Sequence, residues 1–341
     1  MNSVERVKEY LDVEQEAKAR IPENKPPGNW PSHGAVLFTN YTTRYRSDLA
    51  PVLKNLNFKI EPKEKVGIVG RTGAGKSSLA LALFRGLEAD SGMIMIDDIN
   101  IGLIGLQDLR ESLCIVSQDP TLFTGDIRSN LDPFGLFTDE ELFAALRSVH
   151  LIGTPLSASS PPSSSGTREA AMLTPPKSPS SMFEGSDPKN SLTRVDTNAR
   201  ENANIFYNLS SPISESGSNL SQGQRQLLCL ARALLKSPRV LIMDEATASI
   251  DYATDAKIQE TLREIKGSTI ITIAHRLETI IDYDKVLVLD KGEVVEFDAP
   301  WELIKRDGGI FRGMCQMSGD FEGLKEGAKK AERKGKLVDI D

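Results

Sequence analysis

Gly70-Arg71-Thr72-Gly73-Ala74-Gly75-Lys76-Ser77 is the stretch that decides the fold. It matches the pattern Gly-x4-Gly-Lys-Ser/Thr, and it lies between a predicted strand (65–69) and a predicted helix (77–84). The glycines let the backbone turn until its N–H groups face an anion, and the helix adds the positive end of its dipole. A chance glycine turn would not explain both the pattern and its context. The sequence therefore predicts a loop that holds the phosphates of a nucleotide.

The side chains of this loop have separate expected roles. Lys76 is expected to face the β- and γ-phosphates, Ser77 to ligate Mg²⁺, and Ser78 to donate to an oxygen of the α-phosphate. The full set of nucleotide contacts predicted here is Gly70, Thr72, Gly73, Ala74, Gly75, Lys76, Ser77 and Ser78.

A second element pairs a buried strand with two acids. Val240-Leu241-Ile242-Met243 is followed directly by Asp244 and Glu245. Sites in open α/β sheets lie at the carboxyl ends of strands. We therefore expect Asp244 to hold Mg²⁺ through water and Glu245 to act as the base that polarises the attacking water. Many buried strands end in Asp, so this pattern is informative only because a phosphate loop precedes it.

The rest of the chain alternates between strand and helix patterns. Strands are expected at 36–38, 53–60, 93–96, 113–116, 269–273, 285–289 and 294–297, and helices at 4–19, 127–131, 139–149, 221–235, 252–265, 300–305 and 310–317. Residues 157–203 are rich in Ser, Pro, Thr and Asn, which predicts a disordered insertion. The basic stretch 325–336 is expected to be a frayed, solvated tail.

Composition excludes several classes of protein. The 341 residues carry a net charge of −7, which does not suggest a broad nucleic-acid surface. No apolar run approaches the ~20 residues of a membrane helix. The three cysteines are widely spaced and odd in number, so we interpret them as reduced thiols and not as a disulfide framework or zinc site.

Leu220-Ser221-Gln222-Gly223-Gln224 opens a predicted helix about 20 residues before the Asp244 strand. Ser221 could serve there simply as a helix cap. The stretch resembles the signature sequence of ABC ATPases, Leu-Ser-Gly-Gly-Gln, and the other motifs of that family follow in order around it. The resemblance implies that Ser221, Gly223 and Gln224 contact ATP held by an opposite domain.

Four further positions carry the same resemblance. Gln118 looks like the glutamine that senses the γ-phosphate and ligates the metal, His275 like the switch histidine, and 248–251 like the D-loop. Tyr45 resembles the aromatic residue that stacks on adenine, with Tyr41 as its competitor.

The resemblance covers about 35–317 and is closest to the second nucleotide-binding domain of C-subfamily transporters of the multidrug-resistance-associated type, especially fungal vacuolar members of the bile-acid group. It implies an α/β fold: a P-loop NTPase core of the ABC ATPase type, an antiparallel β-subdomain and a helical signature subdomain. It implies that 1–34 end the last membrane helix and form a linker, that 35–318 form the ATPase domain, and that 319–341 are a flexible basic tail.

The resemblance also implies function and partners. ATP and Mg²⁺ would be bound, and hydrolysis would drive export of organic anions or conjugates. The partners would be the first nucleotide-binding domain and the membrane domains of the parent transporter, on the cytosolic face of the vacuolar or the plasma membrane. Two alternatives stay open: an ATP-sensing module with little turnover, and a soluble ABC ATPase without a transport role.

The signature departs from the family at one residue. Gln222 stands where the family has glycine, and its side chain crowds a close approach to phosphate. In this subfamily that signature serves the composite site that hydrolyses poorly. Lys76, Asp244 and Glu245 are intact for the other site.

Overall fold

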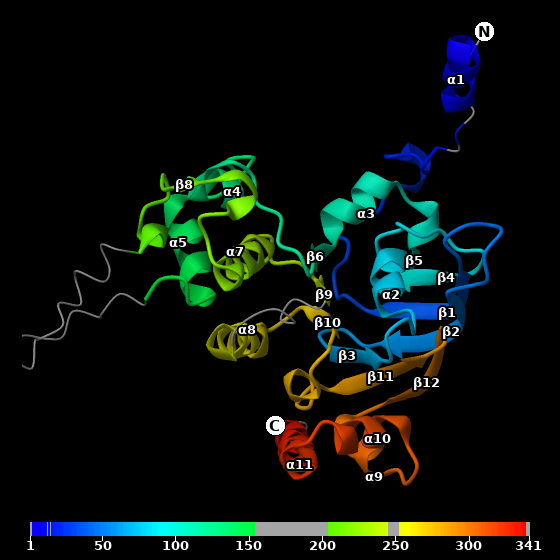
Figure 1. The fold of residues 1–341 in the computed structure, drawn as a ribbon, viewed down its shortest axis with the longest axis vertical. Coiled ribbons are helices and arrows are strands. Elements are labelled where there is room, and N and C mark those ends of the chain that lie inside the picture. The colour runs from blue at the N-terminus through cyan, green and yellow to red at the C-terminus, as the bar shows by residue number, and fades with distance from the viewer. Residues whose placement is uncertain (1, 12, 14, 154–203, 245–251, 339–341) are drawn as a thin grey trace, which may run out of the picture.

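A computed structural model describes residues 2–11, 13, 15–153, 204–244 and 252–338 of the chain. Its centre is a six-stranded sheet with the order β12-β11-β3-β10-β9-β6 (Figure 1). These strands are β3 (Lys65–Gly70), β6 (Cys114–Val116), β9 (Val240–Asp244), β10 (Thr269–Ile273), β11 (Lys285–Asp290) and β12 (Glu293–Asp298). Neighbouring strands are parallel except in the β11–β12 hairpin. The predicted α/β core is therefore confirmed.

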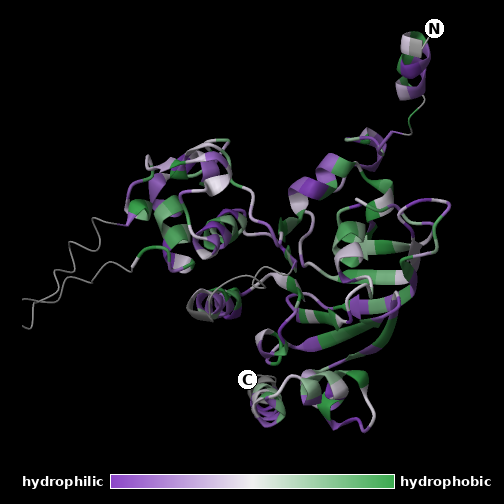
Figure 2. Ribbon diagram, in the orientation of Figure 1, coloured by the Kyte–Doolittle hydropathy of each residue, from purple (hydrophilic) through white to green (hydrophobic). Residues whose placement is uncertain are grey.

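The central strands β3, β9, β10 and β11 are mostly apolar and are buried along almost their whole length, because both faces of the sheet are covered. In β9, Val240 and Ile242 join one buried cluster, while Leu241 and Met243 join another on the opposite face. Figure 2 shows the strands of the sheets predominantly in the hydrophobic colour, in contrast to the polar helix at the N-terminus. A sheet with one exposed face would instead show polar residues at alternate positions along each strand.

A second sheet is antiparallel and has the order β2-β1-β4-β5. Its strands are β1 (Val36–Thr43), β2 (Leu53–Ile60), β4 (Ser91–Ile96) and β5 (Ile99–Asn100). Helix α2 (Lys76–Leu83) packs Leu79, Ala80 and Leu83 into a core shared by the two sheets. This core fixes the helix that follows the phosphate loop.

A helical lobe forms the predicted signature subdomain and lies on the far side of the central sheet from β1 and β2 (Figure 1). It contains α4 (Ile127–Leu131), α5 (Asp139–Ser148), α7 (Gln222–Leu235) and the short pair β7 (Gly125–Asp126) and β8 (Pro212–Ile213). Its core continues into β6 and β9 and includes Ile258 and Leu262 of α8 (Tyr252–Glu264). The predicted insertion at 157–203 lies outside the described residues.

The C-terminal residues agree with expectation only in part. Helices α9 (Pro300–Lys305) and α10 (Ile310–Met317) have their predicted bounds, but α11 (Phe321–Val338) replaces the predicted frayed tail. Leu324 and Ala328, one turn apart, are only 2% and 1% exposed and join a core beneath β3 and β11. The prediction relied on the basic charge of this segment and overlooked its narrow apolar stripe. Such a stripe is enough for a helix to pack on an existing core.

The N-terminal helix α1 covers Asn2–Leu11 and is shorter than the predicted 4–19. Its described side chains are exposed, so no packing extends it. Helix α3 (Leu106–Ser112) was not predicted. No helix within the described residues is long and apolar enough to cross a membrane.

One carboxylate organises the entry into β1. Asp97 accepts hydrogen bonds from the backbone N–H groups of His33 (2.7 Å), Gly34 (2.9 Å) and Ala35 (2.8 Å). Burial by itself would raise the pKa of Asp97, but these backbone donors outweigh burial and hold its pKa below the usual value. The ionised carboxylate therefore stabilises this turn.

Replacing Asp97 with asparagine should lower the free energy of unfolding at neutral pH by about 1–2 kcal/mol. Asparagine tolerates the left-handed backbone at this position (φ 44°), so the change isolates the charge. Because folding lowers the pKa, the stabilisation is present above the unfolded-state pKa of about 3.9 and disappears as the pH falls below it. Urea denaturation at several pH values measures this, with Asp98→Asn as the neighbouring left-handed control (φ 64°). If the loss of unfolding free energy in Asp97→Asn were the same at every pH, the ionised carboxylate would not be its cause.

Candidate nucleotide-binding site

The phosphate loop joins β3 to α2 with the backbone that its glycines permit. Gly73 and Gly75 are left-handed, with φ of 80° and 104°. A Cβ at Gly70 would lie 2.3 Å from the carbonyl oxygen of Leu289. Glycine is therefore required at position 70 by a close approach of β11, and at 73 and 75 by conformation.

Lys76 begins α2 and is only 7% exposed. Its Nζ donates to the carbonyl oxygens of Gly70 (3.0 Å) and Arg71 (3.3 Å). The ammonium group is thus held inside the loop, where the expected phosphates would bind. A positive charge at a helix N-terminus surrounded by N–H donors forms an anion site.

Strand register brings the distant motifs to the same edge of the sheet. Ile273 of β10 is aligned with Ile68 of β3 on one side and with Asp244 of β9 on the other. Because these strands are parallel, Asp244 at the end of β9 and His275 just after β10 lie at the same edge of the sheet as the phosphate loop. This alignment is the structural reason why residues from three parts of the sequence can serve one site.

A cavity of about 800 Å³ opens beside the loop. It is lined by Gly70, Thr72 and Lys76 from the loop, by His275 and its neighbours, by the β11–β12 turn and by α10. The structure therefore brings His275 to the phosphate loop. The contribution of α10, through Ile310, Met314 and Met317, was not predicted, because the periodicity of a helix does not say what it packs beside.

Tyr45 and Tyr41 differ in accessibility. Tyr45 is 52% exposed, and its hydroxyl lies 2.9 Å from Oγ of Ser78 in α2. Tyr41 is 2% exposed, its hydroxyl donates to the carbonyl of Leu87, and burial raises its pKa to about 12. Of the two rings, only that of Tyr45 is free to stack on a base. This observation supports the choice of Tyr45.

The signature stretch forms the start of α7. Oγ of Ser221 accepts from the N–H of Gln224 (3.1 Å), and Oε1 of Gln224 accepts from the N–H of Ser221 (2.9 Å). A Cβ at Gly223 would lie 2.7 Å from Cγ2 of Thr254 in α8, so this glycine is required by helix packing. These residues do not line the cavity beside the phosphate loop.

Of the remaining predicted site residues, the structure describes Gln118 but not Glu245 or the D-loop. Gln118 is exposed and follows β6, and Nε2 of Gln226 in α7 donates to the adjacent carbonyl of Ser117 (3.1 Å). Gln118 therefore lies at the junction between the core and the helical lobe. Glu245 and the D-loop residues 248–251 are outside the described residues.

The donor set fits a hard cation. Ser77 and Asp244 offer hydroxyl and carboxylate oxygens at one edge of the sheet, and Mg²⁺ prefers oxygen ligands completed by water and phosphate. The described residues hold no group of three His, Cys, Asp or Glu that could bind a metal by themselves. A nucleotide-dependent Mg²⁺ site needs no such group.

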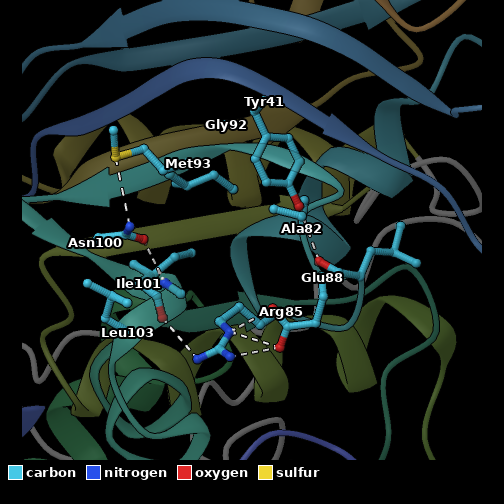
Figure 3. A pocket seen from close by; sticks show the side chains of 13 residues that line it. Tyr41, Ala82, Arg85, Glu88, Gly92, Met93, Asn100, Ile101 and Leu103 are labelled. Carbon is cyan, nitrogen blue, oxygen red and sulfur yellow. Dashed lines mark hydrogen bonds and ion pairs between the residues drawn. The ribbon is translucent and has the colours of Figure 1, made fainter.

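A second, smaller cavity of about 230 Å³ lies between the C-terminal end of α2, β4 and residues 100–103 (Figure 3). At its base Arg85, 7% exposed, pairs with the carboxylate of Glu88 (2.8 Å) and donates to the carbonyls of Ile101 (3.0 Å) and Ile104 (2.7 Å). All three guanidinium nitrogens are used. Arg85 therefore acts as a structural clamp between the end of α2 and the segment before α3.

Arg85→Met should lower the free energy of unfolding by about 2–4 kcal/mol, because it leaves two buried carbonyls without their donor. Arg46→Met is the control: Arg46 pairs with Asp48 at 3.2 Å, but both side chains are more than 60% exposed. Such a surface pair contributes about 0–1 kcal/mol. Chemical denaturation of the two variants provides the comparison, and equal losses would contradict the clamp.

The ABC transporter family model matches residues 53–248, which is more than half of the chain. The chain belongs to the ABC transporter family and carries its ATP-binding domain.

Individual relatives agree with this assignment. "ABC transporter 7" of Pyricularia oryzae is 63% identical over 100% of this chain, and the "ATP-dependent bile acid permease" of Saccharomyces cerevisiae is 49% identical over 97%. The chain spans only 19% and 18% of their respective lengths. The structure also matches that of a bacterial Atm1-family ABC exporter with ATP bound, with a TM-score of 0.69 and 28% identity over 91% of this chain and 46% of the other. The resemblance to fungal C-subfamily transporters is thus confirmed.

Proposed function

We propose that this domain binds and hydrolyses Mg²⁺-ATP to drive the export of organic anions or conjugates by a longer transporter. The observation that carries the proposal is the buried ammonium of Lys76 within the glycine loop, facing the cavity that it shares with His275. A buried cation with backbone donors and a nearby imidazole suits the terminal phosphates of a nucleotide.

Each predicted residue has a place in the mechanism. Tyr45 stacks on adenine, Ser78 donates to the α-phosphate, and Lys76 neutralises charge at the β- and γ-phosphates. Glu245 accepts a proton from the attacking water, and His275 positions the γ-phosphate. The contribution of the protein is mainly positioning and charge stabilisation.

Mg²⁺ would supply charge neutralisation at the phosphates when bound. Ser77 and Asp244 would hold it, with Gln118 as a further oxygen donor at the lobe junction. Because Gln118 is in the segment between the sheet and the helical lobe, its engagement couples the occupied site to lobe position.

The site is completed by a partner domain. Ser221, Gly223 and Gln224 lie outside the cavity of their own domain, which suits residues that contact ATP held by another. The first nucleotide-binding domain of the parent transporter is the proposed partner. Gln222 would weaken the composite site that this signature serves, while Lys76, Asp244 and Glu245 serve the more active one.

The transported substrates and the membrane are inferred from relatives. Yeast relatives are named a bile acid permease and a metal resistance protein. Amphipathic organic anions and conjugates, exported across the vacuolar membrane, are the class that we propose. The membrane domains of the parent would carry the selectivity.

An ATP-sensing module with little turnover is the second candidate. The intact Lys76 and the placement of His275 beside the loop favour hydrolysis over sensing. A soluble ABC ATPase is disfavoured, because the relatives are transporters and permeases.

Transport by the parent protein in vacuolar membrane vesicles, with the cytosolic face outward, tests the function. Wild-type vesicles should accumulate a labelled bile acid or glutathione conjugate when Mg²⁺-ATP is supplied, and Glu245→Gln vesicles should not. ATP hydrolysis without any accumulation of either class would refute the proposed substrate class. Equal ATP-dependent uptake by the two proteins would refute the proposed role of the site.

A further inference from the structure

The residues before the domain make an unusual contact with α3. The carbonyl oxygens of Lys18 and Ala19 accept hydrogen bonds from the N–H groups of Leu106 (3.1 Å) and Gln107 (2.8 Å). These are the first two residues of α3, whose N-cap Gly105 provides no side-chain cap. Groups that normally need a cap are thus satisfied by the incoming chain.

Gly105 is required by this contact. A Cβ at that position would lie 2.6 Å from the carbonyl oxygen of Ala19 and 2.7 Å from Cα of Arg20. Its φ of −67° suits any residue, so backbone conformation does not demand glycine here. The close approach of the preceding segment explains this glycine.

Side chains strengthen the same contact. Nε of Arg20 donates to Oε1 of Gln107 (3.1 Å), and Arg20 lies 3.8 Å from a carboxylate oxygen of Glu111. Asn24 donates to the carbonyl of Leu103 (3.1 Å) just before α3. The segment is therefore attached at several points along one helix and the turn before it.

Arg110 extends the contact to the C-terminal end of α2, the helix that follows the phosphate loop. Its guanidinium reaches Glu16 at 3.4 Å and also donates to the carbonyls of Phe84 (3.2 Å) and Arg85 (3.4 Å). Those two residues directly follow α2, the helix that starts at Lys76. In the other direction, α3 leads through β6 to Gln118 within a few residues. Figure 1 shows the incoming segment beside α3, remote from the helical lobe.

We propose that residues 16–20 form a linker clip, which transmits movement of the segment ahead of the domain to the helix of the phosphate loop and to the strand that precedes Gln118. The inference rests on the proposed function, in which that segment continues from a membrane helix. The clip gives the segment ahead of the domain a hydrogen-bonded connection to α2 and to the strand that precedes Gln118. It defines Gly105 and Arg110 as positioning residues that do not touch ATP.

Gly105→Val tests the clip. In this chain, the amide hydrogens of Leu106 and Gln107 should exchange about five- to tenfold faster in the variant, the effect expected for losing one hydrogen bond each. Gly28→Ala is the control, because a Cβ at Gly28 meets nothing within 4 Å. Exchange of those amides at the wild-type rate would overturn the clip as a structure.

The parent transporter gives the functional readout. The Gly105→Val protein should keep ATP affinity and basal ATPase activity, while transport per ATP hydrolysed falls about fivefold or more, a typical strength of coupling between sites. The double variant Glu16→Ala/Arg20→Ala, altered only at exposed linker residues, should shift transport per ATP in the same direction without affecting the fold. Unchanged transport per ATP alongside faster exchange would overturn the coupling role. Absence of ATPase activity in the wild-type parent would instead refute the proposed function, with the exchange comparison still deciding whether the clip forms.

Discussion

Lys76→Ala should weaken the binding of Mg²⁺-ATP by about 100-fold or more. Lys76 is the buried cation of the phosphate loop, and losing one member of a buried charge contact costs about 2–5 kcal/mol. At ~1.4 kcal/mol for each factor of ten, about 3 kcal/mol corresponds to a loss near 100-fold. Titration calorimetry of the chain with Mg²⁺-ATP measures the dissociation constant directly.

The control for net charge is Lys59→Ala, at an exposed lysine that pairs with Glu61 at 2.9 Å on β2. That variant should bind ATP as the wild type does. An unchanged dissociation constant for Lys76→Ala, with the fold intact by circular dichroism, would disprove the assignment of the phosphate loop.

Glu245→Gln should preserve ATP binding and reduce turnover by about 10²–10⁴-fold, the range for loss of a positioned general base. Glutamine keeps the size of the side chain but cannot accept the proton of the attacking water. The measurement is steady-state phosphate release by the parent transporter, with ATP affinity determined in parallel. A residual rate close to that of wild type would exclude Glu245 as the base.

Glu278→Gln provides the matched comparison. Glu278 is an exposed acid that lines the same cavity as Lys76 and His275, but it has no assigned role in hydrolysis. Its replacement should change turnover little. If both variants lost turnover equally, the effect would come from the charge of the cavity and not from one base.

Local patterns predicted much of the fold. The bounds of β2, β10 and α4 agree with their expected ranges, because strand and helix patterns there are flanked by clear turn residues. The predictions were wrong where tertiary packing determines whether a segment is helical. Charge in 325–336 suggested a frayed tail, whereas Leu324 and Ala328 dock α11 on the core. The opposite error extended α1 beyond Leu11 to residue 19, although the described side chains of α1 are exposed and the carbonyls of Lys18 and Ala19 bond to α3 instead.

The site was predictable to the extent that it is local. The phosphate loop could be identified because its glycines and Lys76 are consecutive in sequence. The approach of His275 to that loop depends on the register of β3 and β10, which no short motif encodes, and was expected only through a family resemblance. The clip on α3 uses backbone carbonyls of Lys18 and Ala19, so only Gly105 marks it in the sequence.

In the proposed function, this chain forms one half of a composite ATP site. Mg²⁺-ATP turnover by this chain, alone and mixed with the first nucleotide-binding domain of the same parent, tests this arrangement directly. Turnover by the chain alone should be slow, should rise clearly when the partner is added, and should lose that rise in the Glu245→Gln variant. ATP binding with turnover at background in both conditions would contradict the claim and favour an ATP-sensing module.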